Sequence, residues 1–316
     1  MRIVLVGPGI MPIPPKSWGA VEILIWDQKQ TLEGLGHDVQ IVNTGSREEI
    51  IKQVNSISPD FVHVHYDEHW HVCDELQCDN VAITSHFGYL EQPARYGSYY
   101  WNIFRGFLSM RKARIFALSE GISMVYIRHG FNPTRVSVVP NGARCDLFGF
   151  LDECPLPERS IYLAKIEPRK RQHMFEGIPG LYFAGNVCDP RFSPSSPFYL
   201  GEFEKERLYS DLTNYANLVL LSDGEAHPLV CLEALSAGLG LVVSEFATGN
   251  LDTTLPFIDV IPESHIHDRQ YVSSVIDANR KVSVTMRNQI RRYAEDNFSW
   301  ENIVTGRLLP AINRIR

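Results

Sequence analysis

Short apolar runs alternate with longer amphipathic stretches along almost the whole chain. The apolar runs are rich in valine, isoleucine and leucine, as buried strands are, and the stretches between them have the apolar spacing of helices. Strands are expected at residues 3–6, 38–42, 60–65, 81–88, 113–119, 136–142, 161–163, 181–185, 198–201, 218–222 and 239–244. Helices are expected at residues 20–35, 47–58, 120–129, 204–214, 271–294 and 302–314. This alternation predicts an α/β protein with parallel sheets.

A change in composition near the middle of the chain predicts a domain boundary. Residues 149–160 are rich in proline, aspartate and glutamate, as linkers are. A length of 316 residues also favours two domains. We therefore expect one α/β domain over residues 1–148 and a second over residues 149–298. Residues 251–270 look irregular.

Composition and charge exclude several classes of protein. Hydrophobic residues make up 44% of the chain and charged residues 21%, which is typical of a soluble globular protein. A net charge of -7 argues against a general nucleic-acid binder. No apolar run approaches the roughly 18 residues of a transmembrane helix, and the first run is too short for a signal peptide. We expect a cytoplasmic protein with reduced cysteines and leave peripheral membrane contact open.

Two carboxylates, Glu225 and Glu233, lie eight residues apart in the most informative stretch of the chain. Glu225 follows the expected strand at 218–222, and Glu233 lies in a helix-like run that ends at Gly238. A loop after a parallel strand faces the crevice where α/β proteins bind ligands. From the spacing alone, a pair of binding residues and a pair of solvated acids are equally favoured.

A basic run follows the first expected strand of the second half. It consists of Lys165, Arg169, Lys170 and Arg171. A solvated surface is the ordinary interpretation of such a run. Clustered cations after a strand also suit a bound diphosphate, so both interpretations stay open at this point.

Glycines after the first strand fit a nucleotide-binding loop only in part. Gly7 and Gly9 resemble the dinucleotide fingerprint, but Pro12 stands where its third glycine belongs. Gly19 and Ala20 open the first expected helix. A helix N-terminus without bulky side chains presents free N–H groups to an anion, although close packing explains these small residues equally well.

Histidines gather after two expected strands of the first half. Four of them occupy positions 63, 65, 69 and 71, but their spacing matches no known metal motif, so core or crevice histidines are favoured over zinc ligands. His86 ends another strand, where it can hydrogen-bond a substrate or share a proton. The aromatic residues of segment 89–107 are better explained by packing than by an acceptor pocket.

In their order along the chain, these motifs resemble the retaining GT-B glycosyltransferases of glycosyltransferase family 4. The resemblance covers nearly the whole chain. It implies two Rossmann-like domains facing a cleft, with the C-terminal helix, residues 299–316, crossing back to the N-terminal domain. The matching motifs are Gly19–Glu22, Asp60–His65, Ser85–His86, Ala117–Ser119, Val139–Gly142, Ile166–Lys170, Glu225–Glu233 and Phe298–Trp300.

The resemblance also implies roles for single residues, most of them toward a donor such as a UDP- or GDP-sugar. Glu225 would contact the donor-sugar hydroxyls, and Glu233 would hold the ribose hydroxyls. Lys165 and Lys170 would neutralise the leaving diphosphate, and His86 would lie beside the donor sugar and the acceptor. The implied catalytic residues are His86, Lys165, Lys170 and Glu225. The implied donor-binding residues are Gly19, Lys165, Lys170, Gly201, Glu225, His227, Pro228, Leu229, Val230 and Glu233.

The chain departs from the family pattern at three places. Lys165 stands where the family usually has arginine, which keeps the charge but loses the fork geometry. Arg171 stands where glycine is usual. His227 and Pro228 replace the more common Phe-Gly, so the donor-sugar contacts are the least predictable part of the site. The chain is also short for the fold, so we expect trimmed loops between Arg171 and Gly185.

The function implied by the resemblance is a retaining hexosyltransferase of glycoconjugate or polysaccharide biosynthesis. It would need no divalent metal and no cofactor, because lysines supply the positive charge. The acceptor would be a glycan, a lipid or another hydroxyl compound, and no nucleic-acid partner is expected. A GT-B sugar-nucleotide epimerase and a non-catalytic nucleotide-sugar binder are the alternatives. Glycosidase chemistry is not implied, since no carboxylate pair is required as nucleophile and acid.

Overall fold

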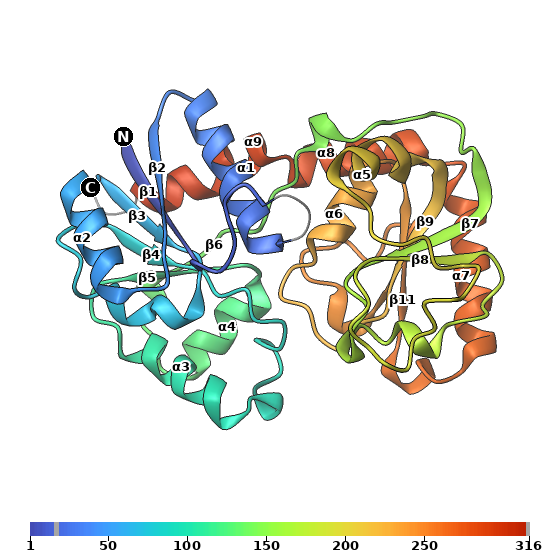
Figure 1. Ribbon diagram of the computed structural model, residues 1–316, viewed down its shortest axis with the longest axis horizontal. Helices are drawn as coiled ribbons and strands as arrows, with labels where there is room; N and C mark the ends of the chain where they lie inside the picture. The colour runs from blue at the N-terminus through green and yellow to red at the C-terminus, as the bar shows by residue number, and fades with distance from the viewer. Residues whose placement is uncertain (16–18, 314–316) are drawn as a thin grey trace. The chain divides into compact units, whose positions relative to one another are not determined.

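The computed structural model describes residues 1–15 and 19–313 and divides into two compact units (Figure 1). Unit 1 comprises Met1–Gly142 and the segment from Trp300 onwards, and unit 2 comprises Ala143–Ser299. The chain therefore returns to unit 1 at its end. Residues 16–18 of the proline-rich loop, and Arg314 as the expected last helical residue, lie outside the described residues.

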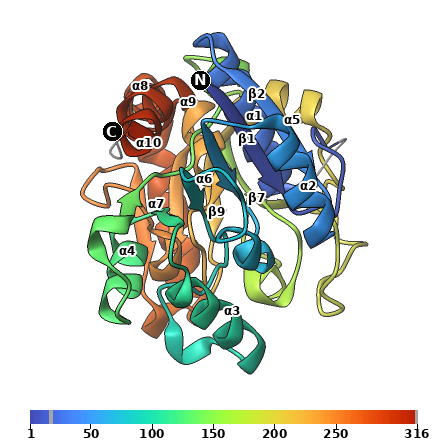
Figure 2. The same ribbon diagram turned by 90° about the vertical axis from the view of Figure 1, so that its left-hand side faces the viewer.

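Unit 1 is built on a six-stranded parallel sheet of order β2-β1-β3-β4-β5-β6 (Figure 2). Most strand positions are buried, as expected when a parallel sheet is covered on both faces. This burial explains why the strands read as continuous apolar runs. The strands are β1 (Arg2–Gly7), β2 (Asp38–Asn43), β3 (Phe61–Val64), β4 (Val81–Ile83), β5 (Arg114–Ala117) and β6 (Val136–Val138).

The helices of unit 1 begin at recognisable caps and include the end of the chain. Ser46 and Ser119 accept hydrogen bonds from the first-turn N–H groups of the helices that follow them. The buried Arg114 guanidinium donates to the Ala311 carbonyl and so ties the last helix to the sheet. The helices are α1 (Ala20–Gly34), α2 (Arg47–Ile57), α3 (Ser98–Ser109), α4 (Glu120–Arg128), α9 (Trp300–Ile303) and α10 (Leu309–Asn313), with a π-turn at Val304–Leu308.

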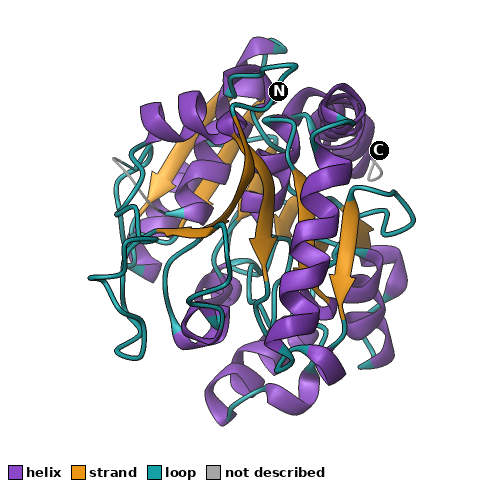
Figure 3. Cartoon of the chain, turned by 90° about the vertical axis from the view of Figure 1, so that its right-hand side faces the viewer, coloured by secondary structure: helices purple, strands orange, loops and turns teal. Residues whose placement is uncertain are grey.

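Unit 2 has a five-stranded parallel sheet of order β11-β10-β9-β7-β8 (Figure 3). Helices α6 and α7 contact its central strands and lie on opposite sides of the sheet in Figure 1. The strands are β7 (Leu156–Leu163), β8 (Leu181–Ala184), β9 (Tyr215–Leu220), β10 (Gly240–Ser244) and β11 (Ile258–Ile261). The helices are α5 (Lys205–Asp211), α6 (Leu229–Ser236), α7 (Arg269–Ser283) and α8 (Arg287–Phe298).

Short 3₁₀ turns join many of these elements. They cover Asp67–Val72, Pro93–Arg95, Pro133–Arg135, Cys145–Leu147, Pro168–Lys170, Gln172–Met174, Leu212–Asn214, Glu245–Ala247 and Glu263–His265. None of the helices in the described part of the chain is both long enough and apolar enough to cross a membrane.

Some expected elements of unit 2 are wrong in detail. Strand β7 starts at Leu156, inside the stretch expected to be a linker. Strand β11 lies in residues 251–270, which look irregular in the sequence. Residues 198–201 form an isolated bridge at Tyr199 and not a regular strand. Residues 271–294, expected to be mostly helical with a weak point at Val282–Thr285, form two helices that break between Ser283 and Arg287, beside that weak point.

Candidate functional site

The strand order of unit 2 reverses at β7, which lies between β8 and β9. The chain passes from β7 to β8 on one side of the sheet and then to β9 on the other. A parallel sheet opens a crevice at the carboxyl ends of its strands at such a reversal, and α/β proteins bind ligands there. The basic run follows β7, and Glu225 follows β9. The sheet itself therefore brings both sequence motifs to one edge.

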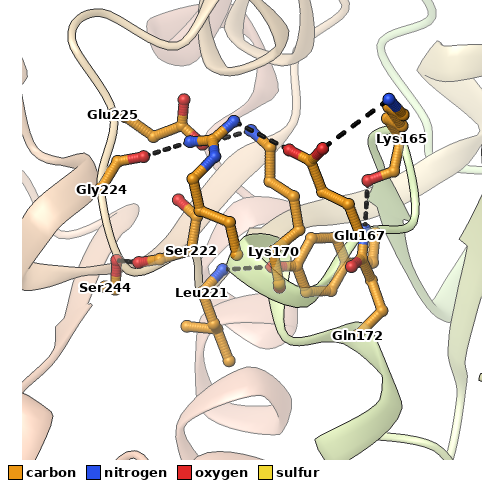
Figure 4. Close-up of polar contacts among 11 residues, drawn as sticks. Lys165, Glu167, Lys170, Gln172, Leu221, Ser222, Gly224, Glu225 and Ser244 are labelled. Carbon is orange, nitrogen blue, oxygen red and sulfur yellow. Dashed lines mark hydrogen bonds and ion pairs between the residues drawn. The ribbon is translucent and has the colours of Figure 1, made fainter. Parts of the chain in front are cut away.

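Glu225 meets two cations at this edge. Its Oε1 accepts a hydrogen bond from the Lys170 ammonium and lies 3.2 Å from Nη1 of Arg169. The side chains of Glu225 and Lys170 are only 10% and 11% exposed. Figure 4 shows Lys170 and Glu225 pointing toward each other from the two loops. This part of the basic run is thus an enclosed ion cluster and not a solvated surface.

The two cations keep Glu225 ionised. Burial by itself raises the pKa of this carboxyl, but the charges of Lys170 and Arg169 outweigh it and leave the pKa of Glu225 below its ordinary value. Arg169 also donates to Glu167 at 3.0 Å, and the Lys165 ammonium lies 3.9 Å from the same carboxylate. Three cations therefore face two carboxylates, which leaves one positive charge in excess. Such a cluster suits a ligand that carries further anionic groups.

Tyr162 of β7 fixes the backbone on both sides of the cluster. Its hydroxyl donates to the Lys170 carbonyl and accepts from the Leu221 N–H at 2.8 Å. The Arg169 carbonyl in turn accepts from the Asp223 N–H at 3.0 Å. These bonds join the loop after β7 to the loop after β9, so the main chain sets the geometry of the Lys170–Glu225 pair.

Lys165 lies at the margin of the cluster. Its ammonium is 3.9 Å from Glu167, and its side chain is 51% exposed. Gln172 Nε2 donates to the Lys165 carbonyl at 3.0 Å, which holds the backbone in place. Lys165 therefore has a fixed backbone and a side chain with room to reach a ligand, whereas the Lys170 side chain is already held.

The backbone at Arg171 has a conformation that favours glycine. Its φ of 61° is in the left-handed region, which favours glycine. The Arg171 guanidinium donates to both carboxylate oxygens of Glu263, at 2.7 and 2.9 Å. A two-pronged ion pair therefore accompanies the strained backbone next to Lys170.

The helix after Glu225 contributes the remaining donor-site candidates. Helix α6 begins at Leu229, and Pro228 has the extended backbone of an N-cap. The N–H groups of Leu229 and Val230 belong to its first turn, the part of a helix that suits an anion. Glu233 follows on the same helix, and His227 before it is 6% exposed, with its ring 6.1 Å from that of Phe298.

Gly201 lies beside the carboxyl end of β8. Its carbonyl accepts a hydrogen bond from the N–H of Gly185, the residue that follows β8, at 3.0 Å. Its φ of 79° again favours glycine. Unit 2 thus holds all of the expected donor-binding residues except Gly19, together with three of the four expected catalytic ones.

The strand order of unit 1 also reverses, at β1, which lies between β2 and β3. The chain after β1 leads to Gly19 at the start of α1. Gly19 has a φ of 129°, and an added Cβ would lie 2.9 Å from Oε2 of Glu22. The positive φ therefore favours glycine here, whether or not an anion binds, and the Glu22 side chain would have to shift for any larger residue.

The histidines of unit 1 form a row at the carboxyl ends of β3 and β4. The His63 and His65 rings are 3.8 Å apart, and His65 stacks on His86 at 5.9 Å. His63 is a core residue, held by Thr84 at 2.8 Å and Gln28 at 3.3 Å. Burial lowers the pKa of His86 to about 4, so its ring is neutral at physiological pH.

The sequence patterns do not single out two residues of these sites, Arg169 and Asp67. Arg169 is one of four basic residues in its run, and the pattern gives no sign that it turns toward Glu225. Asp67 lies among exposed-looking polar residues, yet its Oδ1 atom is enclosed. No group of three or more histidine, cysteine or acidic side chains among the described residues is arranged to hold a metal ion.

Comparison with known proteins adds a family and a fold. Residues 45–147 match the family model described as Glycosyltransferase Family 4. No curated protein sequence matches the chain. Several solved structures resemble it over nearly its whole length at 13–15% identity, and at that identity they show the fold alone.

Three of these structures illustrate the match. AviGT4, a glycosyltransferase involved in avilamycin A biosynthesis, is 15% identical and has a TM-score of 0.72, with 100% of this chain and 98% of that chain covered. Sucrose-phosphate synthase from Thermosynechococcus elongatus is 15% identical, has a TM-score of 0.75 and is matched over 97% of both chains. Anabaena Alr3699/HepE, solved with UDP-glucose, is 13% identical with a TM-score of 0.71, over 97% of this chain and 98% of that chain.

Proposed function

We propose that this glycosyltransferase, whose residues 45–147 match family 4 and whose fold is GT-B, transfers a hexose from a nucleoside diphosphate sugar to a hydroxyl acceptor. The reaction retains the anomeric configuration and uses no divalent metal. The observation that carries this proposal is the enclosed cluster of Arg169, Lys170 and Glu225 at the strand reversal of unit 2.

The cluster contains the charges that such a transfer needs. As the bond between the anomeric carbon and the diphosphate breaks, negative charge builds on the leaving oxygen. Fixed cations stabilise that charge without having to reorganise. Lys170 is held in place by Glu225 and by the backbone, and the more exposed Lys165 can close on the outer part of the diphosphate.

The remaining donor contacts follow from the same edge of the sheet. Glu225 binds donor-sugar hydroxyls with its carboxylate, and Glu233 binds the ribose hydroxyls as a bidentate acceptor. The first-turn N–H groups of Leu229 and Val230 bind phosphate oxygens. Gly201, His227 and Pro228 complete the donor contacts. The UDP-glucose complex of Anabaena Alr3699/HepE, which shares the fold, supports a UDP-sugar as the first donor to test.

Unit 1 supplies the acceptor side of the reaction. Gly19 admits the diphosphate at the start of α1, and His86 lies beside the reacting sugar and the acceptor hydroxyl. The acceptor oxygen attacks the same face of the sugar from which the diphosphate leaves, and the leaving phosphate takes the acceptor proton. The acceptor is a glycan, a lipid or a small molecule, and the enzyme acts in the cytoplasm or at a membrane surface.

Replacing Lys170 tests the proposal. A thermal-shift screen of nucleotide sugars first identifies the donor, because a ligand that binds the folded state raises its stability. Release of the nucleoside diphosphate is then measured for the wild type and for Lys170→Ala. We expect a rate loss on the order of 10²–10³, the usual effect of removing one transition-state donor.

Lys281→Ala is the matched control, since Lys281 is an exposed lysine of unit 2 that pairs with Asp277 away from the cluster. Its activity should equal that of the wild type. Thermal unfolding of both variants shows whether Lys170→Ala stays folded with Glu225 paired to Arg169 alone. Full activity of a folded Lys170→Ala protein would rule out the diphosphate role.

A further inference from the structure

His86 lies in a small turn that its neighbours hold. The Ser85 Oγ accepts a hydrogen bond from the Phe87 N–H at 3.3 Å, so the loop closes around His86. The Ser85 hydroxyl also bonds the Tyr100 hydroxyl at 2.8 Å. The Tyr100 ring stacks on Phe87, with 3.5 Å between the centroids. Tyr100 of α3 therefore contacts both residues that flank His86.

Asp67 lies near Ser85 and Tyr100, at the start of the 3₁₀ turn that follows the neighbouring strand β3. Strands β3 and β4 pair in parallel with Val64 opposite Ile83, so Asp67 and Ser85 leave the same edge of the sheet. The Oδ1 atom of Asp67 is enclosed, and no described residue donates a hydrogen bond to it. Burial raises the pKa of Asp67 to about 7, although the Ser85 and Tyr100 hydroxyls act in the opposite direction.

The tyrosines and histidines around Asp67 stay uncharged near neutral pH. The adjacent Glu68 adds a negative charge that helps to raise the pKa of Asp67. Tyrosines from the neighbouring segments face the same carboxyl, and their pKa values lie above that of an ordinary tyrosine. They are Tyr66, Tyr96, Tyr99, Tyr100 and Tyr126. His65 and His86 stay neutral because burial lowers their pKa values.

We propose that Asp67 is a positioning residue that acts on His86 through the Ser85 hydroxyl and the Tyr100 side chain. A protonated carboxyl competes as a donor for the lone pairs of Ser85, whereas a carboxylate only accepts. In the ionised state the Ser85 hydroxyl can donate to Asp67, while its oxygen accepts from the Tyr100 hydroxyl and from the Phe87 N–H. Ionised Asp67 therefore orders the turn that carries His86.

This link can be tested without any assumption about the reaction. The ring resonances of His86, assigned by comparison with His86→Gln, are followed by NMR in the full-length protein as the pH is raised through neutrality. We expect them to shift with a midpoint of about 7, the pKa of Asp67, although the His86 ring itself stays neutral. The shift should vanish in Asp67→Asn and in Ser85→Ala, because each removes one part of the connection.

Glu68→Gln is the matched control, since Glu68 is the neighbouring carboxylate in the same turn and is exposed. It should keep the pH response of the His86 signals and lower its midpoint only slightly, because the Glu68 charge makes a small contribution to the raised pKa of Asp67. Two results would overturn the proposal. One is a wild-type His86 signal that does not respond in this range, and the other is a response that survives Asp67→Asn.

The consequence for catalysis rests on the proposed function and is measured separately. Donor turnover by the wild type should rise about tenfold as the pH passes through 7, the size expected when a reacting group is better placed. The KM for the donor should stay nearly constant, because all the proposed donor-binding residues except Gly19 lie in unit 2. Asp67→Asn should show no such rise in kcat, and an unchanged rise would contradict positioning by Asp67. Failure of the wild type to turn over any nucleotide sugar would refute the proposed function, and the NMR result would still decide the role of Asp67.

Discussion

Asp67 and Glu225 are both enclosed carboxyl groups, but their surroundings differ. Glu225 lies against Lys170 and Arg169, whose charges outweigh the cost of its burial and keep it ionised. Asp67 lies against the Ser85 and Tyr100 hydroxyls and beside Glu68, so burial dominates and raises its pKa to about 7. The two carboxyls therefore suit different tasks. Glu225 is a permanent charge, and Asp67 changes its charge near neutral pH.

The raised pKa of Asp67 predicts how stability depends on pH. Its folded-state pKa of about 7 exceeds the ordinary value of 3.8, so the folded protein binds more protons than the unfolded chain between these values. Its contribution to the free energy of unfolding is therefore present below pH ~4 and is lost as the pH rises toward 7. At about 1.4 kcal/mol per pKa unit, the largest effect is about 4 kcal/mol. Asp67→Asn should be more stable than the wild type at pH 8 and nearly equal to it at pH 4.

Denaturant unfolding over this pH range measures the difference. Glu68→Gln, which changes the neighbouring carboxylate, should keep a pH dependence of the same sign, displaced slightly to lower pH because the Glu68 charge helps to raise the pKa of Asp67. An Asp67→Asn curve that runs parallel to the wild-type curve at every pH would show that Asp67 does not titrate in this range.

The sequence could indicate which residues share an edge but not which side chains turn inward. The motifs place Lys170 and Glu225 after two strands of one parallel sheet, and the structure has them paired. Nothing in the basic run distinguishes Arg169, which joins the pair, from Arg171, which bonds Glu263 instead. Inward orientation depends on contacts between distant parts of the chain, such as the bond of the Tyr162 hydroxyl to the Leu221 N–H. The roles of these residues toward a donor stay predictions.

Among the elements, the loop between β7 and β8 has the strongest influence on the site, because it carries both Lys165 and Lys170. Three constraints hold it: the bond from Tyr162, the bond from Gln172 to the Lys165 carbonyl, and the ion pair of Arg171 with Glu263. The left-handed backbone at Arg171 turns the chain just after Lys170. The ion pair therefore stabilises the conformation that presents Lys170 to Glu225.

Substitutions at Arg171 separate the strain from the ion pair. Arg171→Ala loses the pair and keeps the left-handed backbone, which costs roughly 1–2 kcal/mol for a residue other than glycine. Arg171→Gly loses the same pair but relieves that strain. We expect Arg171→Gly to be more stable than Arg171→Ala by about 1 kcal/mol in denaturant unfolding. Equal stability of the two variants would mean that the backbone at this position is not strained in solution.

Fold prediction from the sequence succeeded where strands are continuous apolar runs and failed where polar residues interrupt them. Central strands such as β9 are buried along their whole length, so they read as apolar runs. Strand β11 lies at the edge of its sheet and has polar Asp259 in a short span, so the pattern hides it. The first half of β7 is exposed and contains Pro157, Glu158 and Arg159, which resemble a linker.

At the scale of the whole molecule, the chain forms two parallel sheets, each with its own strand reversal and its own cluster of polar residues. The C-terminal segment belongs to unit 1, where Arg114 bonds its backbone. In unit 2, Arg287 of α8 likewise joins distant segments of the chain through hydrogen bonds to their backbone. This arginine is 2% exposed and donates to the carbonyls of Leu151, Thr213 and Tyr215, at 2.7, 2.6 and 3.2 Å.

Because each unit has its own sheet and core, we expect two unfolding transitions in calorimetry. Arg287→Met leaves several buried carbonyls without their donor and should destabilise only the unit 2 transition, by about 3 kcal/mol or more. Arg292→Met, which replaces an exposed arginine of the same helix, should move neither transition.

A nucleotide sugar at about a hundred times its Kd should stabilise the transition that Arg287→Met lowers, by roughly 2.7 kcal/mol, because most of the proposed donor residues lie in unit 2. A ligand that raises only the other transition would place the main donor site in unit 1, and a single transition that shifts as a whole would show that the two units unfold together.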